Sequence, residues 1–250
     1  MSLFGRLLGR QKVRWEEAWH TFPGTLDDGS AVWSVDLGAV YAAPVAQLPV
    51  RVDVEAPYAA DAQGLPADGT DVTRLEDAVR RAVSGLDGAY VGRVAGGGRV
   101  RFTAHLPAEP SAPVSLPGVA GAEVRTAYDP HWAYVRDALT PDDRQHRVIA
   151  DLALVGHLAE EGDPLTSPRG VAHVAVFADP DAAERAAAEL RASGFTTGVE
   201  RDDEGEFVLT AVRSDPVAPP GIHELSWSVK EAVERHGGTY DGWTGAPAAG

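Results

Sequence analysis

Histidine spacing is the most direct test for metal chemistry in this sequence. A metal-binding pair usually stands as H-x-H or H-E-x-x-H, which places two imidazoles on one ion. No pair here has that spacing, and His146 and His157, which would share a helix face, stand about 16 Å apart along the helix axis. We therefore expect no metal site. The histidines are His20, His105, His131, His146, His157, His173, His223 and His236.

Covalent catalysis and phosphate binding also lack their usual residues. The chain has no cysteine, which excludes thiolate nucleophiles, disulfides and cysteine-ligated metals. No serine stands in a G-x-S-x-G motif. The glycine-rich loop at 96–98 precedes the strand-like segment RVRFTAHL, whereas a phosphate-binding loop opens a helix. We expect a hairpin turn at these glycines and no cofactor.

Carboxylates are the chemically active groups that the chain holds in excess. It has 37 acidic and 22 basic residues, and residues 140–250 hold 20 of the acidic but only 9 of the basic ones. This charge repels nucleic acid and anionic lipid and attracts a basic protein surface, although it also serves solubility alone. The candidate partner-binding residues crowd one turn and one helix end: Asp202, Asp203, Glu204, Glu206, Glu160, Glu161 and Asp163.

The segment GGTYDGW, residues 237–243, is the most specific motif in the chain. Gly237 and Gly238 suit the left-handed geometry that ends a helix. Tyr240 would then enter a strand, and Asp241 and Gly242 would turn the chain so that Trp243 folds back on the sheet. We expect a structural role for the motif, and direct contact with a partner is the alternative.

The elements that must position these residues are clearest in the second half of the chain. Thr140-Pro141 and Asp179-Pro180 are helix starts, because each pairs an N-cap residue with a proline at the first helical position. After a leading helix to about Glu161, the order reads β-α-β-β-α-β, with strands at 170–177, 195–201, 206–213 and near Tyr240, and helices at 179–194 and 221–236. This order predicts a ferredoxin-like antiparallel sheet with both helices on one face.

The first half of the chain predicts a second α+β sandwich. A helix begins near Thr70 and ends at Gly85 or Gly88, and Asp129-Pro130 starts a short helix through Ala138. Residues 38–47 are expected to be irregular. Strands are expected at 13–19, 31–37, 48–55, 89–95, 99–106 and 123–127. The domains are then an N-terminal flexible or docking peptide at 1–12, an α+β domain at 13–139, the ferredoxin-like domain at 140–244 and a disordered tail at 245–250.

No apolar run approaches 18 residues, so we expect no membrane span and no membrane partner. The opening segment MSLFGRLLGR is too short and too interrupted by arginine for a secretory signal. We expect a cytoplasmic protein.

Residues from about 142 to 250 resemble the regulator of ribonuclease E activity B family, whose members inhibit ribonuclease E. The matching features are Gly162-Asp163 before Pro168-Arg169, the strand VAHVAVF at 171–177, Ser193-Gly194-Phe195, the turn at 202–204 and the terminal GGTYDGW. The resemblance implies a non-enzymatic protein that binds a ribonuclease E-like endoribonuclease and lowers its cleavage of RNA. It implies no direct binding of nucleic acid by this chain.

Residues 13–139 are similar to a bacterial domain family of unknown function that sometimes accompanies the inhibitor domain. The similarity rests on Gly64-Leu65-Pro66, Leu75-Glu76-Asp77, VGRVAGGG at 91–98 and Asp129-Pro130-His131-Trp132. That family implies no known chemistry.

A function of another class stays open at this point: a small ligand-binding protein or hydrolase with a pocket between the two domains. A cleft that gathers His131, His173 or His236 with carboxylates would favour it. A clustered acidic surface without a deep cleft would favour the regulator.

Overall fold

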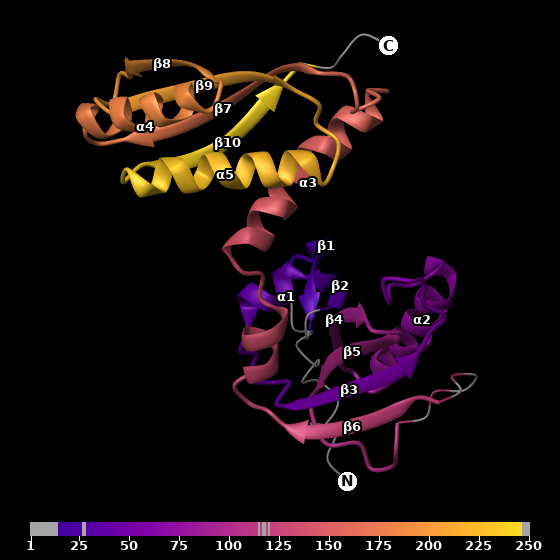
Figure 1. Ribbon diagram of the computed structural model, residues 1–250. Helices are drawn as coiled ribbons and strands as arrows, with labels where there is room; N and C mark the ends of the chain where they lie inside the picture. Colours follow the sequence, from indigo (N-terminus) through magenta and orange to yellow (C-terminus); the bar gives the residue numbers. More distant parts are fainter. Residues whose placement is uncertain (1–14, 27–28, 115, 117–118, 120, 247–250) are drawn as a thin grey trace. The chain divides into compact units, whose positions relative to one another are not determined.

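The computed structural model describes residues 15–26, 29–114, 116, 119 and 121–246. The expected N-terminal peptide at 1–12 and most of the expected tail at 245–250 lie outside these residues. The chain divides into two compact units, Met1–Asp142 and Asp143–Gly250, which we call the N-terminal and C-terminal domains (Figure 1). Both combine helices with an antiparallel sheet, so the expected α+β class is confirmed. No described helix is long and apolar enough to cross a membrane.

The N-terminal domain contains a six-stranded sheet in the order β1-β2-β4-β5-β3-β6. All neighbouring strands pair antiparallel. The glycine-rich loop joins β4 to β5 in a hairpin, as expected, with Gly97 and Gly98 at φ 58° and 75°. The strands are β1 (Trp19–Leu26), β2 (Gly29–Asp36), β3 (Val50–Pro57), β4 (Ala89–Gly96), β5 (Arg99–Leu106) and β6 (Glu123–Tyr128).

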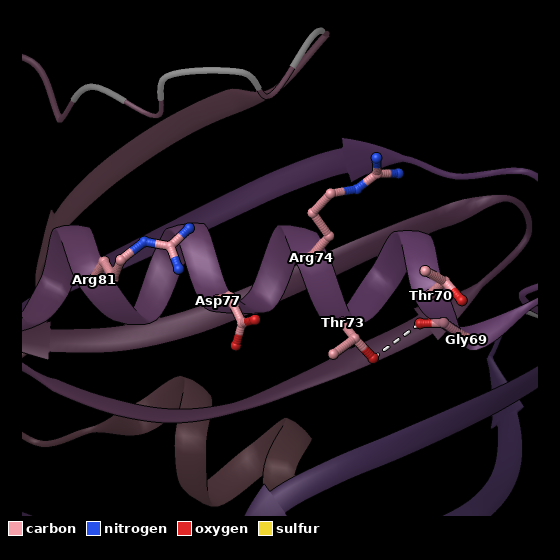
Figure 2. Close-up of a pocket in the computed structure, with 6 residues that line it drawn as sticks. All are labelled: Gly69, Thr70, Thr73, Arg74, Asp77 and Arg81. Atoms are coloured by element: carbon pink, nitrogen blue, oxygen red, sulfur yellow. Dashed lines mark hydrogen bonds between the residues drawn. The ribbon is translucent and has the colours of Figure 1, made fainter.

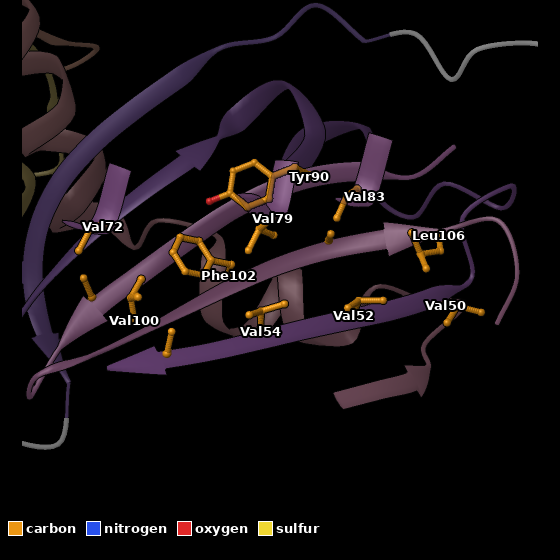
Figure 3. Close-up of a cluster of buried hydrophobic side chains, with 13 residues drawn as sticks. Val50, Val52, Val54, Val72, Val79, Val83, Tyr90, Val100, Phe102 and Leu106 are labelled. Carbon is orange, nitrogen blue, oxygen red and sulfur yellow. The ribbon is translucent and has the colours of Figure 1, made fainter. Parts of the chain in front are cut away.

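Helix α2 (Gly69–Gly85) packs on one face of this sheet. The Asp68 carboxylate accepts the Thr70 amide hydrogen and caps the helix, which begins at Gly69, one residue before the expected start near Thr70. Figure 3 shows the resulting core, in which Val79 and Val83 of the helix lie with Phe102 of β5. Alternation along the strands places these residues together, because every second side chain of a strand faces the helix.

Trp132 and the segment that follows it cover part of the opposite face of the sheet. The short helix expected in this segment begins later than predicted. The helical turns begin at Ala133, not at Pro130, because Trp132 takes a left-handed φ of 53° and interrupts the chain direction. Asp129 still acts as a cap, since its carboxylate accepts the Ala133 amide hydrogen at 2.8 Å. A π-helical turn, η2 (Val135–Leu139), completes the segment. The fully buried Trp132 ring stacks on His105 with centroids 3.9 Å apart.

Two further expectations near the start of the domain are wrong. Residues 15–18 form no strand, because the buried Asp36 carboxylate accepts hydrogen bonds from Trp15 Nε1 and the Ala18 amide. Asp36 also caps α1 (Leu37–Ala42), a short helix in a segment expected to be irregular. The strand instead begins at Trp19 and runs to Leu26.

The C-terminal domain has the expected β-α-β-β-α-β order after a leading helix. Its four strands pair antiparallel in the order β10-β7-β9-β8, which is the ferredoxin-like arrangement. The elements are α3 (Asp143–Glu160), β7 (Arg169–Phe177), α4 (Pro180–Ala192), β8 (Thr196–Arg201), β9 (Phe207–Asp215), α5 (Gly221–Arg235) and β10 (Thr239–Gly245).

Two apolar clusters hold this domain together. In the larger one, Ala183, Ala186 and Leu190 of α4 and Val229 and Val233 of α5 meet the sheet. The alanines bring α4 close to the strands, because a methyl side chain leaves little space between backbones. In the smaller cluster, Val155 and Leu158 of α3 meet Ile222 of α5 and Trp243 of β10. The leading helix is therefore part of the folded C-terminal domain.

Candidate functional site

A buried carboxylate on α3 forms the most connected polar centre of the C-terminal domain. Asp151 is 0% exposed and accepts hydrogen bonds from Arg147 Nε at 2.9 Å, Trp243 Nε1 at 2.8 Å and Ser226 Oγ at 2.6 Å. His223 Nδ1 lies 3.2 Å from the second carboxylate oxygen. These partners come from α3, α5 and β10, so one side chain ties the leading helix to the last helix and the last strand of the ferredoxin-like fold.

The chemistry of this centre is structural. Ser226 donates its hydroxyl hydrogen to Asp151 and not to a histidine, whereas the nucleophilic serine of a Ser-His-Asp triad donates to the histidine that takes its proton. Ser226 is also fully buried, and a nucleophile must reach a substrate. Sequence reasoning missed Asp151, because its partners on α5 and β10 stand 72 to 92 residues away along the chain. The only local signal was an aspartate on the face of α3 that carries Val155.

The GGTYDGW motif closes the sheet beside this centre. Gly237 takes φ 80° and ends α5, and a side chain on Gly238 would overlap the Phe177 ring. A bulge between Tyr240 and Gly242 shifts the pairing of β10 with β7. The bulge turns Trp243, which is 5% exposed, into the cluster around α3.

Tyr240 pairs with His173 in the interior. The Tyr240 hydroxyl lies 2.7 Å from His173 Nδ1, and the His173 ring also meets the Phe195 ring edge-on. Burial lowers the pKa of His173 to about 4, with a smaller opposing effect from the Asp215 charge, and burial raises the pKa of Tyr240. Both groups are therefore uncharged at neutral pH. Within the motif, the side chains of Thr239 and Asp241 are exposed.

The acidic turn between β8 and β9 presents carboxylates to solvent. Asp203, Glu204 and Glu206 are exposed. Asp202 has a structural part, because its carboxylate accepts the amide hydrogens of Glu204 and Glu206 at 3.0 and 2.9 Å. Asp203, Glu204 and Glu206 are thus the members whose side chains are available to a partner.

Asp163, a member of the second acidic group, does not belong to the candidate partner-binding surface. Asp163 is buried, and its carboxylate binds the Arg169 guanidinium and accepts the Leu165 amide hydrogen. Glu160 and Glu161 are exposed at the end of α3. Asp163 follows Gly162, which takes φ 85° and directs the chain inward. The sequence pattern was the same for all three residues, so only the fold separates them.

The two acidic groups lie at opposite ends of the sheet. Arg169, the partner of Asp163, begins β7 and pairs with Asp215, whereas the turn joins the strands at the end where Phe177 pairs with Phe207. Figure 1 shows the end of α3 and the β8–β9 turn on different sides of the domain. The nine residues of β9 separate the groups by about 26 Å. They therefore form two surfaces and not one.

Comparison with known families assigns both halves of the chain. Residues 149–244 match the family model described as "Regulator of ribonuclease activity B", and residues 17–140 match the one described as "Family of unknown function (DUF695)". Each domain thus resembles one known family. The described function of the first family is regulation, not catalysis. No curated protein matches the chain.

The part that matches the regulator family contains most of the buried centre. Asp151, His223, Ser226 and Trp243 fall inside 149–244, and Arg147 stands two residues before it. The acidic turn and the whole GGTYDGW motif also lie inside the match. The buried centre, the acidic turn and the motif therefore all belong to the regulator-like domain.

Two hollows lie in the described part of the DUF695-like domain, and one is an open surface while the other is lined by ion pairs. Figure 2 shows one along the outer side of α2, where all lining residues belong to that helix. Arg74 there pairs with Asp71, and Thr73 Oγ1 donates to the Gly69 carbonyl oxygen at 2.9 Å. A surface formed by a single helix encloses no ligand.

A groove of about 290 Å³ crosses β3, β5 and β6 of the same domain. Its floor carries Asp53, which pairs with Arg51 at 2.9 Å, and Glu55, which pairs with Arg101. Burial raises the pKa of Asp53, with smaller opposing effects from Arg51 and Thr103. Arg101 also donates to the Tyr134 hydroxyl at 3.2 Å, so these charges fasten the segment beside η2 to the sheet.

The three histidines expected at a catalytic cleft have separate surroundings. His131 is exposed in the DUF695-like domain, His173 is buried against Tyr240, and His236 Nε2 lies 2.8 Å from a Glu189 carboxylate oxygen. Across the described part of the chain, no group of three or more histidine, aspartate or glutamate side chains could hold a metal ion.

Proposed function

We propose that this chain is a non-enzymatic regulator that binds an endoribonuclease of the ribonuclease E type and inhibits it. The observation that carries the proposal is the match of residues 149–244 to the regulator family. The protein would then act in the cytoplasm, where RNA is processed, without touching RNA itself. The DUF695-like domain has no role in this proposal.

The charge of the regulator-like domain supports binding to a nuclease. An enzyme that binds RNA presents basic surface to phosphate groups, and an acidic protein domain is attracted to the same surface. Residues 140–250 hold 20 acidic and 9 basic residues. The acidic turn concentrates three exposed carboxylates within four residues, Asp203, Glu204 and Glu206. We infer that this turn is the first contact with the nuclease.

Titration of the full-length protein into an RNA cleavage assay with a ribonuclease E-type enzyme tests the proposal. The wild type should lower the cleavage rate, and the double variant Asp203→Lys, Glu204→Lys should bind about tenfold or more weakly. Asp202 is left intact, because its carboxylate holds the turn together. Association should slow as ionic strength rises from about 0.05 to 0.2 M, since the Debye length shortens to less than about 10 Å.

A matched control lies at the other end of the domain. Glu160→Lys, Glu161→Lys changes the net charge by the same amount, and both residues are exposed. If both double variants lose affinity equally, net charge and not the turn drives binding. If the wild type neither binds nor inhibits the nuclease at low salt, the proposed function is wrong.

A further inference from the structure

Among the described residues, no helix covers one face of the sheet in the regulator-like domain. Burial alternates strictly along β7, where Val171, Ala175 and Phe177 are buried toward α4 and α5 while the intervening residues are partly exposed. The pairing register of the four strands shows which side chains lie next to one another on the opposite face. We call this surface the open face. Its residues are Ala172, Val174, Val176, Thr196, Gly198, Glu200, Val208, Thr210, Val212, Thr239 and Thr244.

The open face carries four valines, four threonines and one alanine, and it is almost uncharged in a strongly acidic domain. Glu200 is the only ionisable residue of this set, the exposed Asp241 lies in the adjoining bulge of β10, and no residue of the set belongs to the two core clusters. The arginines of the same strands lie on the helix-covered face: Arg213 stacks over Phe195 at 4.5 Å, and Arg201 lies 5.9 Å from the Phe207 ring centroid. Val212, on the inner strand β9 of this face, is 37% exposed.

RNA and a second copy of this chain fit the open face poorly. A sheet that binds single-stranded RNA uses aromatic side chains to stack bases and basic ones to hold phosphates, and this face has neither. Its side-chain positions cover about 350 Å², calculated from the strand spacing and rise. A stable protein dimer buries about 800 Å² on each partner. The area suits one short segment, such as a single amphipathic helix about 10 Å wide.

Charge indicates what flanks that segment. Glu200 stands at the corner of the open face beside Val208, one residue pair before β8 and β9 enter the acidic turn. An occupant that covers the valines therefore ends next to Asp203 and Glu204, which favour Lys or Arg there. We propose that the open face binds a short apolar segment of the ribonuclease, with basic residues flanking the end that meets the acidic turn. This inference rests on the proposed function and names its docking surface.

The absence of cysteine in the chain allows a direct test with a single introduced thiol. Val212→Cys places a small probe on the open face, and Ala188→Cys places one on the exposed side of α4 as a matched control. Each full-length variant is labelled with a fluorescent maleimide, alone and with saturating ribonuclease E-type enzyme, and the labelled chain is quantified on a gel. The enzyme should slow labelling of the Val212→Cys variant about tenfold or more and leave the Ala188→Cys variant within about twofold.

A second pair of variants measures affinity. Thr210→Arg places a positive charge on the open face and should weaken binding about tenfold or more, whereas Ala188→Arg should leave it unchanged. If the enzyme is bound and inhibited but the thiol at 212 is labelled at its free rate, the docking surface is wrong and the proposed function stands. If no binding or inhibition occurs, both are wrong. If labelling of the Val212→Cys variant slows with its own concentration alone, a second copy occupies the face and the assignment is overturned.

Discussion

Replacement of Asp151 by alanine should destabilise the regulator-like domain more than any single surface change. The substitution removes the acceptor for Arg147, whose side chain is only 9% exposed, and leaves a buried cation without a partner. Breaking a buried ion pair by removing one member costs about 3–5 kcal/mol. Ser226 Oγ and Trp243 Nε1 lose their acceptor in the same step, and each unsatisfied buried donor costs about 1–3 kcal/mol.

These costs overlap, because all of the donors share one carboxylate and their effects are not additive. We therefore expect Asp151→Ala to lower the free energy of unfolding by about 4 kcal/mol or more, a large part of the 5–15 kcal/mol typical of a domain. Trp243→Phe, which removes one donor and keeps an aromatic ring, should cost about 1.5–3 kcal/mol. The double variant should lose less than the sum of the two single ones.

Urea unfolding of the full-length protein, followed by circular dichroism, measures these changes. The chain has two domains, so the transition that moves in the Asp151 variant is assigned to the regulator-like domain and analysed separately. Asp241→Ala, an exposed carboxylate in the same β10 strand, serves as the control and should change stability by less than about 0.5 kcal/mol. A loss of less than about 1 kcal/mol in Asp151→Ala would refute the reasoning, because a carboxylate with these partners would then contribute no more than a surface group.

Three further substitutions have defined outcomes. The pKa of His173 falls to about 4 in the folded domain from an ordinary value of 6.5, so the unfolded chain binds a proton first and stability is lost as pH falls from about 6.5 to 4. At pH 5 this loss is about 2 kcal/mol, and His173→Phe should remove that part of the pH dependence in urea titrations at several pH values. Gly238→Ala should lower stability by about 1–3 kcal/mol, because the methyl group overlaps the Phe177 ring, whereas Gly198→Ala meets no neighbour and should be almost neutral; thermal melting of both variants compares them. Trp132→Ala empties a fully buried site and should cost about 3–5 kcal/mol in the DUF695-like domain, and an unchanged melting temperature would contradict the packing described for its ring.

The expectations that held depend on local physical rules. The proline at the first position of α4, the glycines of the β4–β5 hairpin and the alternation along β7 each reflect the conformational preferences of a few neighbouring residues. Such rules also predict the strand and helix order of the C-terminal domain, and that order limits the sheet to very few topologies. They failed at Trp132 and Asp36, because a left-handed φ and a buried carboxylate with distant donors override local preferences.

The same distinction between local rules and long-range contacts applies to the candidate site. Residue counts show the excess of acid in residues 140–250, and motif content indicates the family of each half, because both are properties of the chain itself. The burial of a side chain and its approach to side chains distant in the sequence are not properties of the chain itself. Glu161 and Asp163 look alike in sequence, yet one is exposed and the other binds Arg169 in the interior. Asp151 gains its partners only when β10 and α5 close on α3, and the open face exists only because both helices pack on the other side of the sheet. Long-range packing selects these neighbours, and no short stretch of sequence contains them.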